Sequence, residues 1–543
     1  MQETNGSTPG PQRLGIVTQG SLTKGIDVKL DGDVSLEEIA VGRFVTIQGA
    51  SRRFFGVITD VTLAHTDDRL AQNPPDVSDP FIAQVVSGTA AYGQLHVTPY
   101  LMLGADVEGQ GPLPAKTVPP HFALVRTSDP EEVQLIFGDK DERHIWIGSP
   151  LDMEEAPVCL DIEKLTERSV GVFGKTGTGK SFLTRIVLAE IVQKAKVVSL
   201  IFDMHSEYGW SHRSESKTEV KGLKQLFPAK VAVFTLDEAH TRGKGASADY
   251  VVQIPFDEVT GADIGSLAGV LGLNETQVQL AERLERKLGN RWLMTFLATD
   301  STEDMTGLAG GAEHEQTLSA LHRKLQKLHA FDFLKEKTPD DTVRRIIEYL
   351  DRGTHVVLEF GKYRNNLPAY ILVANLLTRR IHEKYVERTE AALGRKGAEP
   401  NHLIIAIEEA HKFLSPQVAP HTAFATIARE LRKYNVTLLV IDQRPSGIDR
   451  EVLSQVGSKI TCLLEDEQDI EAVLAGQSGA RELRAVLAKL ETKQQALIFG
   501  HAVPMPVVVR TRTYDKEFYA SLGVLDDAER KARAKKDAEE LFR

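Results

Sequence analysis

One eight-residue segment restricts the fold of this chain more than any other. Residues 174–181 read GKTGTGKS and fit the pattern G-x-x-x-x-G-K-[ST]. The apolar run SVGVFG predicts a strand directly before this segment, and the amphipathic run SFLTRIVLAEIVQKA predicts a helix directly after it. Glycines let a loop between a strand and a helix curve closely, so that its backbone N–H groups surround phosphate oxygens. The sequence therefore predicts a phosphate-binding loop in an α/β fold.

The individual residues of this loop have separate predicted roles. Lys180 is expected to contact the β- and γ-phosphates of a nucleotide, and Ser181 is expected to ligate Mg²⁺. The N-terminus of the following helix favours the negative charge of the phosphates. We therefore expect ATP and Mg²⁺ as cofactors and ATP hydrolysis as the reaction. The predicted nucleotide contacts are Gly174, Lys175, Thr176, Gly177, Thr178, Gly179, Lys180 and Ser181.

Two adjacent carboxylates end a second apolar strand. The run LIIAI leads directly into Glu408 and Glu409, and ligands of open α/β sheets bind at the carboxyl ends of the strands. Glu408 stands where an acidic residue usually orients Mg²⁺ through water, and Glu409 is placed to polarise the attacking water. Solvated acids at a strand end are the alternative, and the phosphate-binding loop in the same chain favours the catalytic interpretation.

A third group of candidate residues surrounds the strand VTLLVID. Gln443 ends this strand and could sense the γ-phosphate, while Arg432 lies in the preceding segment IARELRKY. Arg432 could stabilise transition-state charge from a neighbouring subunit, an effect worth roughly 10³–10⁵ in rate. An ordinary helix with ion-paired arginines explains the same residues equally well. Asp203, in the segment FDMHSEYG, has either a structural hydrogen-bonding role or a catalytic one.

The order of β-type and helical patterns predicts several domains. Short β-type runs, among them FIAQVVSGTAAYG at 81–93, alternate with turn residues as in a small all-β barrel. Farther along, apolar strands alternate with amphipathic helices, which is typical of a mainly parallel sheet. The predicted parts are a flexible tail at 1–13, a β-barrel at 14–120, a connector at 121–167, a P-loop ATPase core at 168–520 with a mostly helical insertion at 206–351, and a C-terminal helix at 521–543.

Composition limits the class of protein. The 543 residues are 42% hydrophobic and 26% charged, as in a globular chain of more than one domain. No run of eighteen apolar residues and no apolar leader segment occurs, so we expect no membrane association and a cytoplasmic location. Cys159 and Cys462 lie in apolar runs and are expected to be buried, reduced thiols. The net charge of −11 leaves DNA binding open, because a ring can confine its basic residues to a central channel.

Taken together, the motifs resemble one known family. The segments GKTGTGKS, FDMHSEYG, IEEAHKFL, IARELRKYNV and IDQRPS occur in the order seen in the HerA family of hexameric DNA translocases. That family is a branch of the HerA–FtsK superfamily of P-loop ATPases. The resemblance implies a RecA-like α/β core and an N-terminal β-barrel of the type shared with rotary ATP synthases.

The same resemblance implies partners and an assembly. It implies a homohexamer with ATP sites between subunits and double-stranded DNA in the central pore, and it supports Arg432 as a finger acting in trans. Members of the family work with a partner nuclease, either NurA in DNA-end processing or another effector in anti-phage defence. We therefore expect an ATP-driven DNA translocase or helicase. An ATP-gated ring scaffold that activates a partner enzyme and a conjugation-type coupling ATPase remain as alternatives.

Overall fold

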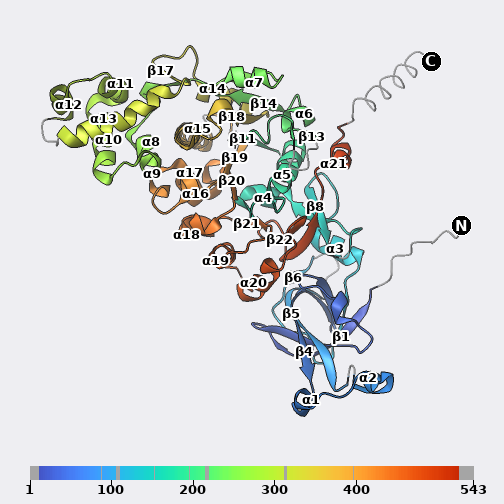
Figure 1. Ribbon diagram of the computed structural model, residues 1–543. Coiled ribbons are helices and arrows are strands. Elements are labelled where there is room, and N and C mark those ends of the chain that lie inside the picture. The colour runs from blue at the N-terminus through green and yellow to red at the C-terminus, as the bar shows by residue number, and fades with distance from the viewer. Residues whose placement is uncertain are drawn as a thin grey trace, which may run out of the picture. The chain divides into compact units, whose positions relative to one another are not determined.

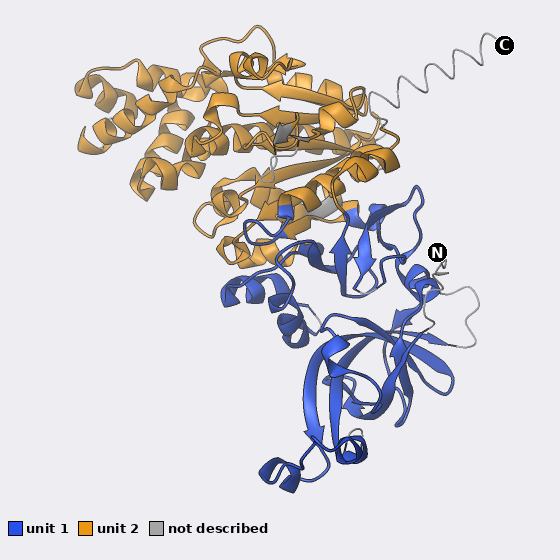
Figure 2. Ribbon diagram, turned by 45° about the vertical axis from the view of Figure 1, so that its right-hand side comes forward, with its two compact units in different colours: residues 1–165, 173–180, 457–512 blue, residues 166–172, 181–456, 513–543 orange. Residues whose placement is uncertain are grey.

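The chain forms two compact units, which Figure 2 shows in different colours. The computed structural model describes residues 11–86, 89–104, 111–151, 153–194, 196–213, 219–310, 315–394, 397–477 and 479–524. Unit 1 comprises residues 1–165, 173–180 and 457–512, and unit 2 comprises residues 166–172, 181–456 and 513–543. No helix within the described residues is long and apolar enough to cross a membrane.

Unit 1 begins with a closed β-barrel. Its six strands follow the order β2-β1-β7-β3-β4-β5, and β5 pairs back onto β2 to close the ring (Figure 1). Apolar side chains alternate along the strands and fill the interior, among them Leu14, Val28, Val45 and Val97. Closure leaves no free strand edge in the ring. The six strands are β1 (Arg13–Ser21), β2 (Gly25–Leu30), β3 (Phe44–Gln48), β4 (Arg52–His65), β5 (Ala91–Gly104) and β7 (Leu124–Thr127). The predicted small barrel is thereby confirmed.

One predicted strand of the barrel region was wrong. The start of the run 81–93 forms the helix α2 (Pro80–Val86), and β5 takes up only the last residues of the run. Pro80 occupies the first position of the helix, where its fixed φ favours a helical start. The Asp79 carboxylate accepts a hydrogen bond from the backbone N–H of Phe81 (2.9 Å). The prediction failed because a short apolar run without alternation fits a strand and a helix equally well.

Besides the barrel, unit 1 contains five further strands. The strands follow the order β21-β22-β23-β8-β9, and each neighbouring pair is antiparallel. They are β8 (His144–Pro150), β9 (Val158–Asp161), β21 (Ser458–Thr461), β22 (Gln495–Gly500) and β23 (Val507–Thr511). Residues 173–180, which hold the predicted phosphate-binding loop up to its lysine, belong to this unit.

Unit 2 contains the α/β core. Its strands follow the order β15-β14-β18-β11-β19-β20-β10, and the pairs from β15 to β20 are parallel. They are β10 (Val170–Phe173, its last residue in unit 1), β11 (Val197–Asp203), β14 (Val231–Thr235), β15 (Tyr250–Val251), β18 (His355–Glu359), β19 (His402–Glu408) and β20 (Val436–Asp442). The central strands are almost wholly buried, which requires continuous runs of apolar residues. Their parallel arrangement confirms the RecA-like α/β fold class.

Two long helices of unit 2 are largely buried. Helix α5 (Lys180–Lys194, its first residue in unit 1) follows the glycine-rich loop, and α15 (Leu367–Leu393) buries most of its first four turns. Segment 206–351 is rich in helices, including α10 (Glu275–Leu288), α13 (Glu315–Leu325) and α14 (Thr342–Asp351), and it also supplies β14 and β15 to the sheet. Helix α21 (Lys516–Ser521) is the last described helix. Most of the predicted tail at 1–13 and of the predicted helix at 521–543 lies outside the described residues.

Candidate nucleotide-binding and hydrolysis site

Hydrogen bonds to residues within and outside the loop hold the glycine-rich loop of unit 1 in place. The N–H of Lys175 donates to the carbonyl of Leu463 (3.1 Å), and the hydroxyl of Thr178 donates to the carbonyl of Lys175 (2.7 Å). A Cβ atom at Gly174 would lie 2.8 Å from the Cβ of Cys462, so only glycine allows this close approach. The loop is therefore a fixed turn, as phosphate binding requires.

The loop also has the free space that phosphates need. Gly177 and Gly179 have φ angles of +84° and +91°, in the left-handed region that favours glycine. A Cβ atom added at either position would meet no atom within 4 Å. Helix α5 begins directly afterwards at Lys180. An open turn with a lysine at the start of a helix fits the phosphate groups of a nucleotide.

The two cysteines are free and buried, as predicted. Burial raises the pKa of the Cys462 thiol to about 12. Since the thiolate is the reactive form of cysteine, the thiol beneath the loop is chemically inert at neutral pH. Cys462 therefore contributes packing to the loop rather than chemistry.

In unit 2, the adjacent residues Glu408 and Glu409 have different hydrogen-bond partners. Glu408 is the last residue of β19 and is only 8% exposed. The hydroxyl of Tyr208 donates to Glu408 Oε1 (2.8 Å). The hydroxyl of Tyr370 binds the backbone of Glu408, donating to its carbonyl (3.0 Å) and accepting from its N–H (3.2 Å). Both the backbone and the carboxylate of Glu408 are thus held by tyrosines.

Glu409 leaves the strand through a strained backbone. Its φ angle is +50°, which costs a non-glycine residue on the order of 1–3 kcal/mol. The side-chain amide of Gln443 donates to the Glu409 carboxylate (3.2 Å to Oε1 and 3.5 Å to Oε2). The Nε2 atom of His411 lies 3.8 Å from Glu409 Oε2. The turn therefore brings Glu409 to Gln443 and His411 and away from the partners of Glu408.

A buried aspartate fixes the histidine beside Glu409. Asp442, the last residue of β20, is fully buried and lies 3.0 Å from His411 Nδ1. It also accepts hydrogen bonds from the backbone N–H groups of His411 and Arg444, both at 2.6 Å. Burial raises the pKa of Asp442, but these hydrogen bonds and the charge of His411 outweigh it and lower the pKa below its ordinary value. Asp442 is therefore an ionised anchor for His411.

Asp203, whose role the sequence left open, has a hydrogen-bonding role in the structure. Its carboxylate accepts from the backbone N–H groups of Glu207 (2.7 Å), Tyr208 (2.9 Å) and Gly209 (3.0 Å). Burial raises the pKa of Asp203 in spite of these three donors. The carboxylate closes the loop that follows β11.

Glu359 is a buried acid that the sequence did not single out. It ends β18, in register with Asp203 at the end of β11. It is 1% exposed, and among the described residues neither carboxylate oxygen has a hydrogen-bond partner. Burial, together with the nearby charge of Asp203, raises the pKa of Glu359 to about 7. The signal was present in the sequence as an acid at the end of the apolar run THVVLEF.

The remaining predicted residue, Arg432, lies in the 3-10 turn Leu431–Tyr434. Its side chain is outside the described part of the structure. The neighbouring Arg429 forms an ion pair with Glu451 (3.4 Å). For Arg429, the structure therefore agrees with the alternative of an ordinary helix with ion-paired arginines.

The oxygen donors of the chain suit Mg²⁺. Among the described residues, no group of three or more His, Cys, Asp or Glu side chains could hold a metal ion. Mg²⁺ does not need such a cage, because it keeps several waters and binds one or two protein oxygens together with substrate phosphates. The Glu408 carboxylate and the Ser181 hydroxyl are donors of this kind.

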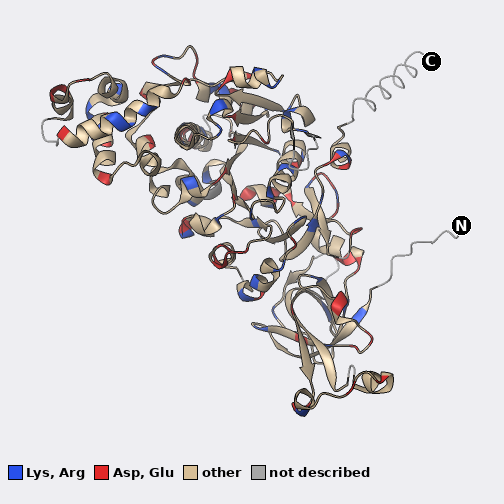
Figure 3. Cartoon of the chain, viewed as in Figure 1, with Lys and Arg blue, Asp and Glu red and all other residues tan. Residues whose placement is uncertain are grey.

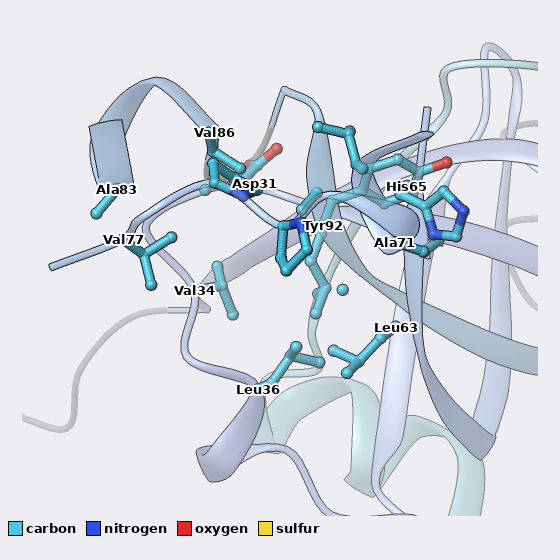
Figure 4. Close-up of a pocket in the computed structure, with 18 residues that line it drawn as sticks. Asp31, Val34, Leu36, Leu63, His65, Ala71, Val77, Ala83, Val86 and Tyr92 are labelled. Carbon is cyan, nitrogen blue, oxygen red and sulfur yellow. The ribbon is translucent and has the colours of Figure 1, made fainter. Parts of the chain in front are cut away.

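The barrel region also contains a cavity, and its lining is mainly apolar. A cavity of about 620 Å³ lies beside the β4–β5 hairpin and the helices α1 (Arg69–Gln72) and α2, as Figure 4 shows. Apolar side chains such as Leu36, Leu63 and Val77 line most of it, with Asp31 and His65 as polar members. No lysine or arginine is among the described residues that line it. The cavity is therefore unsuited to phosphate.

The chain is similar to several known proteins. Residues 145–381 match the protein family DUF87, described as "Helicase HerA, central domain". A protein of Sulfurisphaera tokodaii named DNA double-strand break repair helicase HerA is 23% identical over 529 residues, which cover 94% of each chain. A protein of the same name from Pyrococcus furiosus is 24% identical over 448 residues, which cover 77% of each chain. The solved structure of the bacterial conjugative coupling protein TrwB aligns with a TM-score of 0.47 at 13% identity, covering 71% of this chain and 92% of that one.

The family match contains the whole glycine-rich loop, α5, and the strands β11 and β18. The curated relatives extend the similarity over nearly the full length, including the barrel and the strand that ends in Glu408. Together, these similarities support a HerA-family P-loop ATPase of the HerA–FtsK superfamily.

Proposed function

We propose that this ATPase moves along double-stranded DNA as a homohexamer and works as a translocase or helicase. The observation that carries the proposal is the similarity over 94% of both chains to a DNA double-strand break repair helicase. The different hydrogen-bond partners of Glu408 and Glu409 also support the proposal. ATP hydrolysis in a motor needs one acid that holds the metal and another that activates the attacking water.

The chain offers a residue for each requirement of ATP hydrolysis. Bound Mg²⁺ would offset the negative charge that develops on the phosphates. Lys180 holds the β- and γ-phosphates, and Ser181 and Glu408 hold the metal, Glu408 through a water molecule. Tyr208 and Tyr370 keep Glu408 in place for this role.

Glu409 acts as the general base that takes a proton from the attacking water. Gln443 and His411 hold its carboxylate, so the base is oriented before the reaction. Gln443 is also the proposed γ-phosphate sensor. Since its amide contacts Glu409, a change at the phosphate would reach the base directly.

Arg432 completes the site from a neighbouring subunit of the hexamer. Its guanidinium would stabilise charge on the transferred phosphoryl group. An arginine supplied in trans makes hydrolysis depend on assembly, which links turnover in one subunit to the position of the next.

DNA is held mainly by its phosphate backbone in this proposal. Figure 3 shows both signs of charge on α10 and α13: arginine and lysine residues are interspersed with glutamates in the second half of α10, and α13 begins with Glu315 and carries Arg323 and Lys324 in its last turn. The net charge of −11 argues against a generally basic surface, so in this proposal DNA contacts basic residues that face the pore. Binding through phosphates is indifferent to base sequence and weakens steeply with salt.

DNA cutting comes from a partner in this proposal. The described residues contain no cluster of acids and histidines that could hold the metal ions of a nuclease. The partner is a NurA-like nuclease or another effector, and the pair acts in DNA-end processing or in anti-phage defence.

Stimulation of the ATPase by DNA tests this proposal. We expect linear duplex DNA to raise the rate of ATP hydrolysis in the purified chain without any partner, and Lys180→Ala to abolish hydrolysis with and without DNA. The Lys164→Ala variant is the control, because Lys164 is 55% exposed, pairs with Asp161 and lies outside the glycine-rich loop. An ATPase that ignores DNA and responds only to a partner protein would favour the scaffold function instead.

A further inference from the structure

The loop after β11 is a rigid element built around one carboxylate. Asp203 is fully buried and binds three successive backbone N–H groups, those of Glu207, Tyr208 and Gly209. A carboxylate with three N–H donors leaves the loop little freedom, because each donor would be unpaired in another conformation. The position of Tyr208 is therefore determined by Asp203.

A buried arginine ties the same loop to the helix that follows the glycine-rich loop. Arg185 of α5 is 2% exposed. Its guanidinium donates to the backbone carbonyl of Glu207 (3.1 Å) and to Glu207 Oε2 (3.3 Å). Helix α5 and the end of β11 thus hold the loop from two sides.

The loop presents one functional group to the metal-binding carboxylate. Tyr208 is completely buried, and its hydroxyl donates to Glu408 Oε1 at 2.8 Å. A tyrosine hydroxyl is a neutral donor near pH 7, because the ordinary pKa of tyrosine is about 10. A neutral donor orients a carboxylate without cancelling the negative charge that attracts Mg²⁺.

We propose that Tyr208 is the positioning residue for Glu408 and that it sets the affinity of the site for Mg²⁺. The inference rests on the proposed function, in which Glu408 holds the metal through water. One oxygen of the carboxylate is fixed by Tyr208, and this fixes the plane in which the other oxygen lies. Tyr370 holds the backbone of Glu408 independently, so removal of the Tyr208 hydroxyl releases the carboxylate alone.

Tyr208→Phe tests the proposal because it removes the hydroxyl and keeps the ring. The matched control is Tyr385→Phe, since Tyr385 is also completely buried and its hydroxyl has no hydrogen-bond partner in the described part of the chain. The first measurement is the affinity for a fluorescent ATP analogue in EDTA and across a Mg²⁺ titration. The second is the Mg²⁺ concentration that gives half-maximal ATPase activity.

For Tyr208→Phe we expect unchanged nucleotide affinity in EDTA and a Mg²⁺ requirement raised by roughly tenfold in both measurements, the size of one hydrogen bond to a charged group. Saturating Mg²⁺ should restore most of the turnover. Tyr385→Phe should match the wild type. A purely structural role for Tyr208 would lower the thermal midpoint of Tyr208→Phe and leave its Mg²⁺ requirement unchanged, and that result would overturn the proposal.

Two further variants keep the test decisive. In combination with Glu408→Gln, the effect of Tyr208→Phe on the Mg²⁺ requirement should disappear. If the double variant instead shows the sum of the two single effects, Tyr208 does not act through Glu408. If the phenylalanine variant does not fold, 4-aminophenylalanine at position 208 keeps a weaker donor. It should give an intermediate requirement, and a wild-type requirement would contradict the inference. Undiminished ATPase activity of Lys180→Ala would instead defeat the proposed function itself.

Discussion

At the scale of single residues, the two neighbouring glutamates of the β19 end are separated by one unusual backbone angle. Glu408 continues the strand and is held by tyrosines, whereas Glu409 has φ +50° and faces Gln443 and His411. The strain is consistent with a functional constraint, because nothing in the local sequence makes this conformation favourable for glutamate.

Glu409→Gln should bind ATP as the wild type does and lose turnover by about 10²–10⁴-fold, since only the proton-accepting charge is removed. Filter binding of ATP and single-turnover hydrolysis measure the two effects separately. Glu491→Gln, at an exposed position, is the control and should behave as the wild type. Near-normal turnover in Glu409→Gln would show that another group accepts the proton.

Glu359 predicts a pH dependence of stability. Its pKa is raised to about 7 by burial and by Asp203, so its folded form holds a proton that the unfolded chain releases near pH 4.5. The contribution of protonated Glu359 to the free energy of unfolding is fully present below about pH 4.5 and is lost as the pH rises through about 7. At about 1.4 kcal/mol per pKa unit, the loss amounts to roughly 3 kcal/mol. The wild-type thermal midpoint should therefore fall between pH 5 and pH 8 more than that of Glu359→Gln. Parallel pH profiles for the two proteins would refute this assignment.

Sequence reasoning named the residues to which we assign the chemistry, and it missed the residues that hold them in place. The P-loop and the Glu408–Glu409 pair are visible as local patterns. The contact between Tyr208 and Glu408 joins residues 200 positions apart, and that between Asp442 and His411 joins residues 31 positions apart. No local spacing reveals such contacts, because strand order in the sheet brings them together.

At the scale of elements, the strands were predicted well wherever apolar runs were long. The parallel strands β11, β19 and β20 are buried on both faces, and their sequences are continuous apolar runs as a result. The short run at 81–93 misled the prediction, because Pro80 and Asp79 start a helix there. The two strands that segment 206–351 adds to the sheet were hidden by the helical pattern around them.

The loop after β11 should depend on Asp203 for its stability. Asp203→Ala leaves three buried N–H groups without an acceptor, and each unsatisfied group costs about 1–3 kcal/mol. We expect a loss of several kcal/mol, measured as a lower thermal midpoint. Asp203→Asn keeps one oxygen acceptor and should lose less. Equal midpoints for the alanine variant and the wild type would mean that the loop does not need this carboxylate.

At the scale of the whole molecule, the proposed hexamer shares each ATP site between two subunits. Arg432→Ala should bind ATP and lose turnover, and Lys180→Ala should lose turnover as well. Mixed hexamers of the two variants should regain part of the activity, because some interfaces then combine an intact P-loop with an intact arginine. Steady-state hydrolysis of mixtures at several ratios measures this recovery. No recovery despite proven subunit exchange would place Arg432 within its own subunit's site.

Movement along duplex DNA is the central claim, and displacement of a third DNA strand from a triplex measures it most directly. A protein that travels on the duplex removes the third strand, whatever its sequence, and needs hydrolysis to do so. We predict ATP-dependent displacement by the wild type from a linear duplex with a free end, loss of displacement at high salt, and none by Glu409→Gln. Displacement that proceeds equally with Glu409→Gln, or no displacement by a hexamer that hydrolyses ATP on the same DNA, would contradict the account.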